Sequence, residues 1–475
     1  MNKIRVRFAP APTGFMHLGN ARTALINYLF AHQQSGTFVL RIEDTDFKRT
    51  IEQGIEKIFE NLKWLGLDYD EGPIKGGPYK PYFQSQRAHI YAQYLHQIIE
   101  KNFAYRCFCT AEELESKRAR QIALKIPPRY DRACLKLTPT QIEENLKKQI
   151  PFIWRFKLDE TQKIHFFDLA HKEMLFDLKN FSDIPVTRQD GSFTFLFANF
   201  VDDHEMKISH VFRGEDHLSN TAAQIALYKA FDFEVPVFWH LPIIANKDGK
   251  KLSKRDFGFS LNDLIAAGYL PEAICNYLTI IGGSFKKEIM SMDELIQAID
   301  FDAIKPTGMI KYDLEKLNWV NHQWILKYDL PTLAERCKSY LHEKYPQSAQ
   351  LSNEELIQLV KLVQPDLITL KDISTLLAFY FEKPHISKDL LAHHKFEEYK
   401  EILKQILAQE GKINDVAELI HFMKELCKTN NKLPKELFML LRILVTGRVT
   451  GPSIIDLINT IGLNRFFESL KAELA

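Results

Sequence analysis

The chain has 475 residues, of which 45% are hydrophobic and 26% are charged, and its formal net charge is +1. This composition fits an ordinary soluble globular protein. The sequence contains no run of 18 apolar residues, so we expect no membrane-spanning helix. At about 150 residues per domain, the length predicts about three domains.

The N-terminal segment "MNKIRVRFAP" lacks the apolar core of a signal peptide, so we expect a cytosolic protein. Its six cysteines should then be reduced. The near-neutral charge neither supports nor excludes a nucleic-acid partner, because basic residues can be segregated on one face.

The first elements alternate between strand and helix. Residues 3–10 predict a strand in which Arg5 and Arg7 alternate with apolar residues, and residues 21–34 predict a helix. Residues 37–46 predict a second strand that ends in carboxylates, and residues 51–67 a second helix. This order predicts a parallel α/β sheet.

Later segments predict an interruption of this sheet and then a helical half. Residues 68–85 are rich in Gly and Pro and predict a loop, and residues 86–190 look inserted. Residues 193–218 return to strand character, and residues 220–231 predict a helix. The chain is mostly helical after about residue 256. From residue 323 onward it is helical almost throughout, with breaks at Pro365, Pro384 and Pro434.

The stretch "APAPTGFMHLGNARTAL" (9–25) lies where the first strand ends and a helix begins. Ligands bind at the carboxyl ends of strands in open parallel sheets, and helix N-termini favour phosphate. Gly14 and Gly19 permit close approach of a ligand, and His17 can donate a hydrogen bond to phosphate. The alternative is a Pro-Thr-Gly turn followed by a helix-capping His.

A second stretch, "NKDGKKLSKRDFG" (246–258), is a basic loop that follows the last α/β unit. The ammonium groups of Lys251 and Lys254 and the Ser253 hydroxyl can together neutralise a triphosphate. The alternative is a solvated basic loop.

"HLGN" and "KLSKR" resemble the two signature motifs of class I aminoacyl-tRNA synthetases. The longer strings "RFAPAPTGFMHLGNARTAL", "RIEDTD", "LKWLGLDYDEGP" and "VFRGEDHLSNT" resemble bacterial glutamyl-tRNA synthetase. The resemblance covers almost the whole chain. Each motif alone is weak, but their order, spacing and joint presence are specific.

The resemblance implies that ATP and L-glutamate form glutamyl-adenylate, and that the glutamyl group then passes to the terminal ribose of tRNA. Catalysis should be mainly positioning and electrostatic stabilisation of phosphate oxygens, by His17 and Lys254, with Mg²⁺ accompanying ATP. Asn20 stands where other class members have a second His. The implied ATP-binding residues are His17, Gly19, Asn20, Glu215, Lys251, Leu252, Ser253 and Lys254.

Glutamate needs arginines for its carboxylates and an acid for its amine. The family's arginines fall on Arg7 and Arg213, and its acid falls on Glu43. Alone, Arg7 would suggest a surface charge on an edge strand and Glu43 a strand-end acid or helix cap. The implied glutamate-binding residues are Arg7, Ala9, Ala11, Glu43, Phe195, Asn199 and Arg213.

Two positions depart from the family pattern. Ala11 stands where the family has Ser, and Phe195 where it has Tyr, so each removes a hydroxyl near the amino acid. A lost hydrogen bond costs about 0.5–1.5 kcal/mol. We therefore expect an active enzyme with weakened glutamate binding.

Three cysteines cluster in the segment that looks inserted. A Cys-x-Cys pair and a distant Cys can bind Zn²⁺ in a reduced compartment, given a fourth ligand. Family members with zinc carry this pattern together with Tyr-x-x-x-Cys. Lys136 stands where some members have a His, which favours Tyr130 as the fourth ligand. The expected structural zinc site is Cys107, Cys109, Tyr130 and Cys134, and the alternative is three unligated thiols.

The implied architecture is a discontinuous Rossmann-type catalytic domain followed by an all-α anticodon-binding region. Its expected parts are catalytic halves at 1–85 and 191–255, an acceptor-end-binding insert at 86–190, a stem-contact region at 256–322 and a helical anticodon-binding region at 323–475. The resemblance also implies a cytoplasmic monomer with no membrane partner.

One position bears on which tRNA is charged. Family members specific for tRNA(Glu) can read the third anticodon base with an arginine, whose position falls on Asp366 here. A carboxylate lacks the guanidinium donors, so the arginine-based rejection of tRNA(Gln) is missing. This predicts charging of both tRNAs and a partner tRNA-dependent amidotransferase. The alternative is that Asp366 is a solvated loop residue and discrimination lies elsewhere.

Three other functions remain alternatives. A truncated relative that glutamylates a tRNA base lacks the helical half. A small-molecule nucleotidyltransferase shares an HxGH-type site but does not need "KLSKR" together with that half. A catalytically inactive RNA-binding module would not need the proposed catalytic residues. ATP–pyrophosphate exchange with glutamate, with and without tRNA, separates all three.

Overall fold

A computed structural model describes residues 3–12, 14–45, 52–253, 255–301 and 309–474. The chain divides into two compact units, residues 1–263 with 274–313, and residues 264–273 with 314–475. Each unit has its own buried apolar core. No helix in the described ranges is long and apolar enough to cross a membrane.

The first unit is built on parallel strands connected by helices, as the sequence predicts. β1 pairs with β2, and β8 pairs with β9, each in parallel. Ser209, just before β8, donates its backbone N–H to the Arg5 carbonyl (3.0 Å), which brings β8 beside β1. These elements are β1 (Arg5–Phe8), α1 (Leu18–Gln33), β2 (Thr37–Leu40), α2 (Glu52–Trp64), α6 (Phe195–Glu205), β8 (His210–Gly214), α7 (Leu218–Phe231) and β9 (Val237–Leu241).

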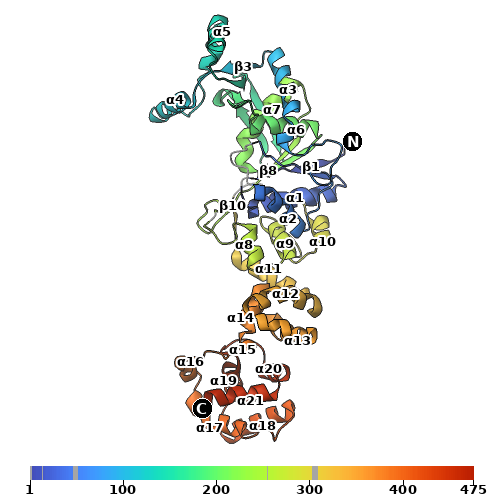
Figure 1. The fold of residues 1–475 in the computed structure, drawn as a ribbon, viewed down its shortest axis with the longest axis vertical. Coiled ribbons are helices and arrows are strands. Elements are labelled where there is room, and N and C mark those ends of the chain that lie inside the picture. Colours follow the sequence, from blue (N-terminus) through green and yellow to red (C-terminus); the bar gives the residue numbers. More distant parts are fainter. Residues whose placement is uncertain (1–2, 13, 46–51, 254, 302–308, 475) are drawn as a thin grey trace. The chain divides into compact units, whose positions relative to one another are not determined.

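The segment between α2 and α6 builds a second, antiparallel sheet in the order β3-β4-β7. Its β5–β6 hairpin instead extends the parallel sheet, because β5 pairs with β9. Figure 1 shows α4 and α5 projecting away from the rest of this unit. The elements are α3 (Ala88–Glu100), β3 (Ala104–Cys107), α4 (Ala111–Ala123), α5 (Pro139–Lys147), β4 (Ile153–Phe156), β5 (Lys163–Asp168), β6 (Lys172–Asp177) and β7 (Ile184–Pro185).

The strand character predicted for residues 193–218 is wrong over its first half, where α6 forms. Apolar residues within 195–205 recur at helical as well as alternating spacing, and the helix buries Phe197 and Phe200 in one core. It also buries Asn199, Asp202 and Asp203, which a helix can direct toward the ends of neighbouring strands. Only the second half of the segment, β8, is a strand.

The rest of the chain is almost entirely helical. β10 (Ile244–Ala245) and β11 (Ile310–Lys311) form a short parallel pair in the first unit. Between these two strands in the sequence come α8 (Leu261–Ala266), α9 (Pro271–Ile280) and α10 (Met292–Ala298).

The second unit contains the remaining helices. Figure 1 shows α12, α13 and α14 packed together, and α17 to α21 packed together. Pro365 follows α13 in a 3-10 turn, Pro384 lies between α15 and α16, and Pro434 begins α19. The helices are α11 (Leu314–Lys327), α12 (Leu330–Lys344), α13 (Asn353–Val363), α14 (Ile373–Leu376), α15 (Ala378–Phe381), α16 (Lys388–His393), α17 (Phe396–Leu407), α18 (Val416–Thr429), α19 (Pro434–Thr446), α20 (Ile454–Ile461) and α21 (Leu463–Leu474).

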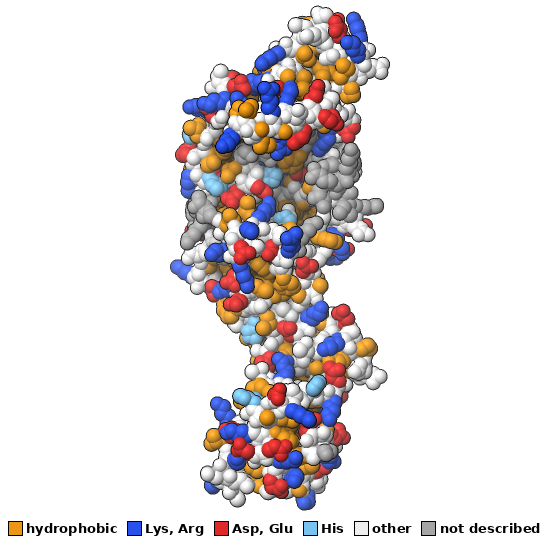
Figure 2. Space-filling model, turned by 90° about the vertical axis from the view of Figure 1, so that its left-hand side faces the viewer, with side chains coloured by type: hydrophobic (Ala, Val, Ile, Leu, Met, Phe, Trp, Pro, Cys, Tyr) orange, Lys and Arg blue, Asp and Glu red, His pale blue; other side chains and the backbone are white. Residues whose placement is uncertain are grey.

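Surface charge is mixed in sign. Lysine and arginine side chains are interspersed with aspartate and glutamate over the face shown in Figure 2. This distribution agrees with the net charge of +1.

Candidate active site

A cavity of about 480 Å³ opens where β1 and β8 end and α1 begins. Most of the residues predicted to bind ATP or glutamate line it. They are Arg7, Ala9, Ala11, His17, Gly19, Asn20, Glu43, Phe195, Asn199, Arg213, Lys251 and Leu252. Glu215 and Ser253 are not among its lining residues, and Lys254 lies outside the described residues.

His17 is the N-cap of α1, where its Nδ1 accepts the backbone N–H of Asn20 (3.2 Å). Its ring stacks on Phe259, and a Cβ on Gly19 would lie only 3.0 Å from Nδ1. Burial first, and then Lys251, lower the pKa of His17 to about 4. The imidazole is therefore neutral at pH 7, with its proton on Nε2 as a hydrogen-bond donor. The capping alternative and the catalytic role are thus compatible.

Two aspartates to which no sequence motif pointed organise the basic loop. Asp256 accepts hydrogen bonds from the backbone N–H and the hydroxyl of Ser253, at 2.8 and 2.9 Å. Asp216 holds the exposed Lys251 ammonium at 2.9 Å. Such an exposed pair is weak, so Lys251 is free to exchange this carboxylate for phosphate.

Arg7 and Glu43 meet in a buried charge network centred on Arg41, which the sequence analysis missed. Arg7 Nε donates to Asp203 Oδ1 at 3.0 Å. The Arg41 guanidinium donates to the same Asp203 oxygen at 2.7 Å and to Glu43 Oε1 at 2.9 Å. The pattern that could have revealed it is the basic residue beside two acids in "RIEDTD" together with the acid pair in "FVDD".

Glu43 is held in place from two sides. Its Oε1 also accepts a hydrogen bond from Asn199 Nδ2 at 2.6 Å. Burial raises the pKa of Glu43 and outweighs the opposite effects of Arg41 and Arg7. A positively charged amine in the cavity would favour the ionised carboxylate.

Arg213 has acceptors along one side of its guanidinium. Nη2 donates to Thr221 Oγ1 and to Gln224 Oε1 (2.7 Å), and Nε lies 3.4 Å from His240 Nε2. Its Nη1 is buried without a hydrogen-bond partner among the described residues. Burial lowers the pKa of Arg213 to about 10, so it stays charged at pH 7. A buried cation with an open donor beside a cavity suits a carboxylate ligand.

Phe195 is the first residue of α6, and its ring centroid lies 5.8 Å from that of His217. It lines the cavity and also a second one of about 810 Å³, so the two adjoin. The second cavity is formed by α4, the segment around β7, and α6 and α7. Its basic lining residues are Lys117, Arg118, Arg129 and Arg155.

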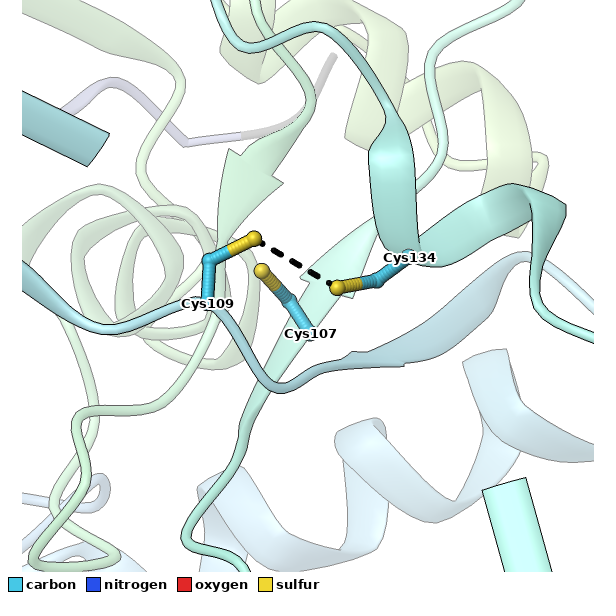
Figure 3. Close-up of side chains that lie close together, drawn as sticks. All are labelled: Cys107, Cys109 and Cys134. Atoms are coloured by element: carbon cyan, nitrogen blue, oxygen red, sulfur yellow. Dashed lines mark hydrogen bonds between the residues drawn. The ribbon is translucent and has the colours of Figure 1, made fainter. Parts of the chain in front are cut away.

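The predicted metal ligands are brought together in the segment between α2 and α6. The sulfur atoms of Cys107, Cys109 and Cys134 lie within 4.8 Å of one another and point toward a common centre (Figure 3). The Tyr130 hydroxyl lies 3.3 Å from Cys107 Sγ and 3.8 Å from Cys109 Sγ. This cluster could hold a metal ion.

Two family models cover most of the chain. Residues 3–319 match the catalytic domain of class I tRNA synthetases (E and Q), and residues 332–473 match an anticodon-binding domain. The chain belongs to the class I glutamyl-tRNA synthetase family. It is 37% identical to the glutamate–tRNA ligases of Finegoldia magna, over 100% of both chains, and of Bacillus subtilis, over 99% of both.

Solved structures of the same family share the fold. One is a glutamate tRNA ligase from Elizabethkingia meningosepticum in complex with its amino acid, with a TM-score of 0.88 and 33% identity over 100% of this chain and 99% of that one. The other, glutamate-tRNA synthetase from Elizabethkingia anophelis, gives a TM-score of 0.89 and 32% identity over 100% of both chains. Within the part that matches the anticodon-binding model, Asp366 ends an exposed 3-10 turn.

Proposed function

We propose that this protein is a glutamate–tRNA ligase that activates L-glutamate with ATP and transfers it to the 3′ end of tRNA. The observation that carries this is the cavity in which His17, Glu43 and Arg213 meet. The test is ATP–pyrophosphate exchange with glutamate. We expect exchange only when tRNA is present, and a protein that exchanges equally without tRNA would contradict the proposal.

The side chains give the cavity two chemically different ends. His17 and Lys251 lie at the end that suits the phosphates of ATP, and Glu43, Arg7 and Arg213 form the end that suits an amino acid with two carboxylates. We assign the glutamate amine to Glu43 and a carboxylate to Arg213 Nη1. In the free protein the charge of Arg7 is balanced by Asp203. We therefore expect Arg7 to act on glutamate through an N–H group that Asp203 does not take and through its electrostatic field.

The chemistry is an attack by the glutamate α-carboxylate on the α-phosphorus of ATP, which forms glutamyl-adenylate and releases pyrophosphate as the leaving group. The neutral His17 donates its Nε2 proton as a hydrogen bond to a phosphate oxygen whose negative charge grows in the transition state. Lys254 and Lys251 are assigned to the same charge. Ser253 and Glu215, which do not line the cavity in the free protein, are also assigned to ATP binding. Mg²⁺ bound with ATP supplies further neutralisation of the phosphates.

We assign the second cavity to the acceptor end of tRNA, because it adjoins the glutamate end and carries four basic side chains. The segment 86–190 would hold this end, residues 256–322 the stem and residues 323–475 the anticodon. The match at 332–473 favours this over the truncated tRNA-modifying relative, which lacks such a region. Since its substrates are tRNA, ATP and L-glutamate, we propose that the enzyme acts in the cytoplasm. We also propose that it is a monomer, as the resemblance to the family implies.

We propose that Cys107, Cys109, Cys134 and Tyr130 bind one structural Zn²⁺, because three sulfurs and one oxygen form a compact tetradentate set. Purified protein should contain about one equivalent of zinc, and Cys109→Ala should lose nearly all of it. Cys427→Ala, which removes a buried cysteine of the second unit, should keep it. Metal analysis of the three proteins decides the matter, and far less than one equivalent in the wild type would contradict the proposal.

We further propose that the enzyme charges both tRNA(Glu) and tRNA(Gln), because Asp366 replaces the discriminating arginine. The two tRNA transcripts should differ in kcat/KM by less than about a hundredfold, or roughly 2.7 kcal/mol. Asp366→Arg should increase the preference for tRNA(Glu), whereas Glu425→Arg, an equal reversal of charge on α18, should not. A larger preference in the wild type would contradict the proposal. Charging of both tRNAs implies an amidotransferase that converts glutamyl-tRNA(Gln).

Phe195→Tyr tests the missing hydroxyl. The new hydroxyl would lie at the start of α6, beside the cavity that contains His17, Glu43 and Arg213. It should lower the KM for glutamate by about two- to tenfold. Phe15→Tyr adds a hydroxyl at the exposed rim of the same cavity and serves as the control. An unchanged KM for Phe195→Tyr would mean that the departure at this position does not affect glutamate binding.

A further inference from the structure

We propose that Asp168 and His240 are positioning residues for Arg213, and that they hold its open donor toward the glutamate carboxylate. The inference rests on the proposed function, since Arg213 is assigned there to glutamate. Neither residue lines the cavity, and neither was singled out from the sequence. All the groups involved belong to the first unit.

The pair lies at the junction of two strands. Asp168 ends β5 and His240 lies in β9, where it is the direct strand neighbour of Arg213 in β8. Both side chains are 0% exposed. Asp168 Oδ2 lies 2.6 Å from His240 Nδ1 and also accepts the His240 backbone N–H at 3.1 Å. Its Oδ1 accepts the backbone N–H groups of Ala170 and His171, both at 2.9 Å.

This arrangement fixes the tautomer of His240. Asp168 is ionised, because its hydrogen bonds with His240 and the backbone lower its pKa despite burial, so it can only accept at Nδ1. The proton of a neutral His240 therefore lies on Nδ1, and Nε2 carries a lone pair. That lone pair faces Thr221 Oγ1 at 2.7 Å and Arg213 Nε at 3.4 Å. The Thr221 hydroxyl has one proton, which can go to Nε2 or to the His217 carbonyl (3.2 Å), and in either case its oxygen accepts from Arg213 Nη2.

Burial, helped by two neighbouring groups, keeps His240 neutral. Burial lowers its pKa, and Arg213 and His171 act in the same direction, against the effect of Asp168. His217 is also neutral, because burial and the Arg213 guanidinium lower its pKa to about 4. A neutral His240 is required, since an imidazolium would present a second N–H to Arg213 and remove the acceptor.

The consequence is that the Arg213 guanidinium is held in one orientation. Three acceptors, on His240, Thr221 and Gln224, take Nε and Nη2 of Arg213, and Nη1 has no hydrogen-bond partner in the part of the chain that the structure describes. An arginine held this way loses less conformational freedom when glutamate binds. The anchor, Asp168, comes from the segment that also carries the cysteine cluster, so this segment contributes to the glutamate site.

Three substitutions test the proposal in the full-length protein. Asp168→Asn places a donor against His240 Nδ1 and drives its proton to Nε2, which removes the acceptor that faces Arg213. His240→Asn keeps a donor for Asp168 but has no group at Nε2, whereas His240→Gln can place an oxygen near Nε2. Asp168→Asn and His240→Asn should each weaken glutamate binding about tenfold or more. His240→Gln should retain more affinity for glutamate than His240→Asn.

The readouts are the glutamate Kd of the free protein, by calorimetry, and the KM values for glutamate and ATP in tRNA-dependent exchange. We expect the glutamate constants to rise and the KM for ATP to stay the same. His210→Asn, on the same strand as Arg213 but with Ser209 and Phe30 as its neighbours, is the control and should leave all of them unchanged.

Different results would contradict the positioning role of Asp168 and His240 and the glutamate-binding role of Arg213 on which it rests. If Arg213→Gln leaves glutamate binding unchanged, the proposed role of Arg213 is wrong. If Arg213→Gln weakens binding but Asp168→Asn and His240→Asn do not, or if they raise both KM values equally, the positioning role is wrong. Equal losses for His240→Asn and His240→Gln would also overturn it, because they would show that the Nε2 acceptor is irrelevant.

Discussion

Replacing His17 with Asn should lower the rate of tRNA-dependent ATP–pyrophosphate exchange by about a hundredfold or more and leave the Tm unchanged. An asparagine oxygen can still accept the Asn20 N–H and cap α1, but the Nε2 donor is lost. Because the pKa of His17 is lowered to about 4, the histidine should already act in its neutral form at pH 7. Its contribution should therefore not change between about pH 6 and pH 8.

His17→Ala is the comparison that separates the two roles. It should lose the same rate but also about 1 kcal/mol of stability, since the cap is removed. Lys254→Ala should reduce exchange as sharply without affecting the Tm, because its assigned partner is a phosphate. Near-normal exchange in His17→Asn or Lys254→Ala would show that the two signature motifs do not carry the chemistry.

Replacing Arg213 with Gln should raise the KM for glutamate by about a hundredfold or more, with little change in the KM for ATP. The substitution leaves a substrate carboxylate unpaired, because it removes Nη1, the buried donor that has no partner among the described residues. Thr221 and Gln224 also lose their cationic partner, so the Tm of the variant must be measured beside its kinetics.

Arg213→Lys is the matched variant, because it keeps the charge but not the planar fork. It cannot satisfy His240, Thr221, Gln224 and a carboxylate together, so it should bind glutamate only slightly better than Arg213→Gln. If either variant weakened ATP and glutamate equally, Arg213 would be a structural residue rather than a ligand for glutamate.

The sequence was sufficient for most of the order of the elements and for many of the residues that line the cavity. Short alternating strands followed by helices required a parallel sheet, and a parallel sheet brings the ends of β1 and β8 to one edge. His17 was predicted from its place at the turn where a strand ends and a helix begins, whereas Glu43 and Arg213 were predicted from the resemblance of their motifs to the family. Residues 195–205 were assigned wrongly, since an almost continuous apolar run fits a buried strand as well as a helix.

Only the tertiary structure decided how the charges of the site are balanced. Arg41, Asp203, Asp168 and His240 are far apart in the sequence, and no local spacing relates an acid in β5 to a histidine in β9. Their pairing arises because burial of a charge is costly without a partner, and the partner is supplied by whichever strand or helix packs alongside. The sequence by itself therefore predicted most of the charged groups that line the cavity, whereas the packing of α6, β5 and β9 determined how those groups are oriented.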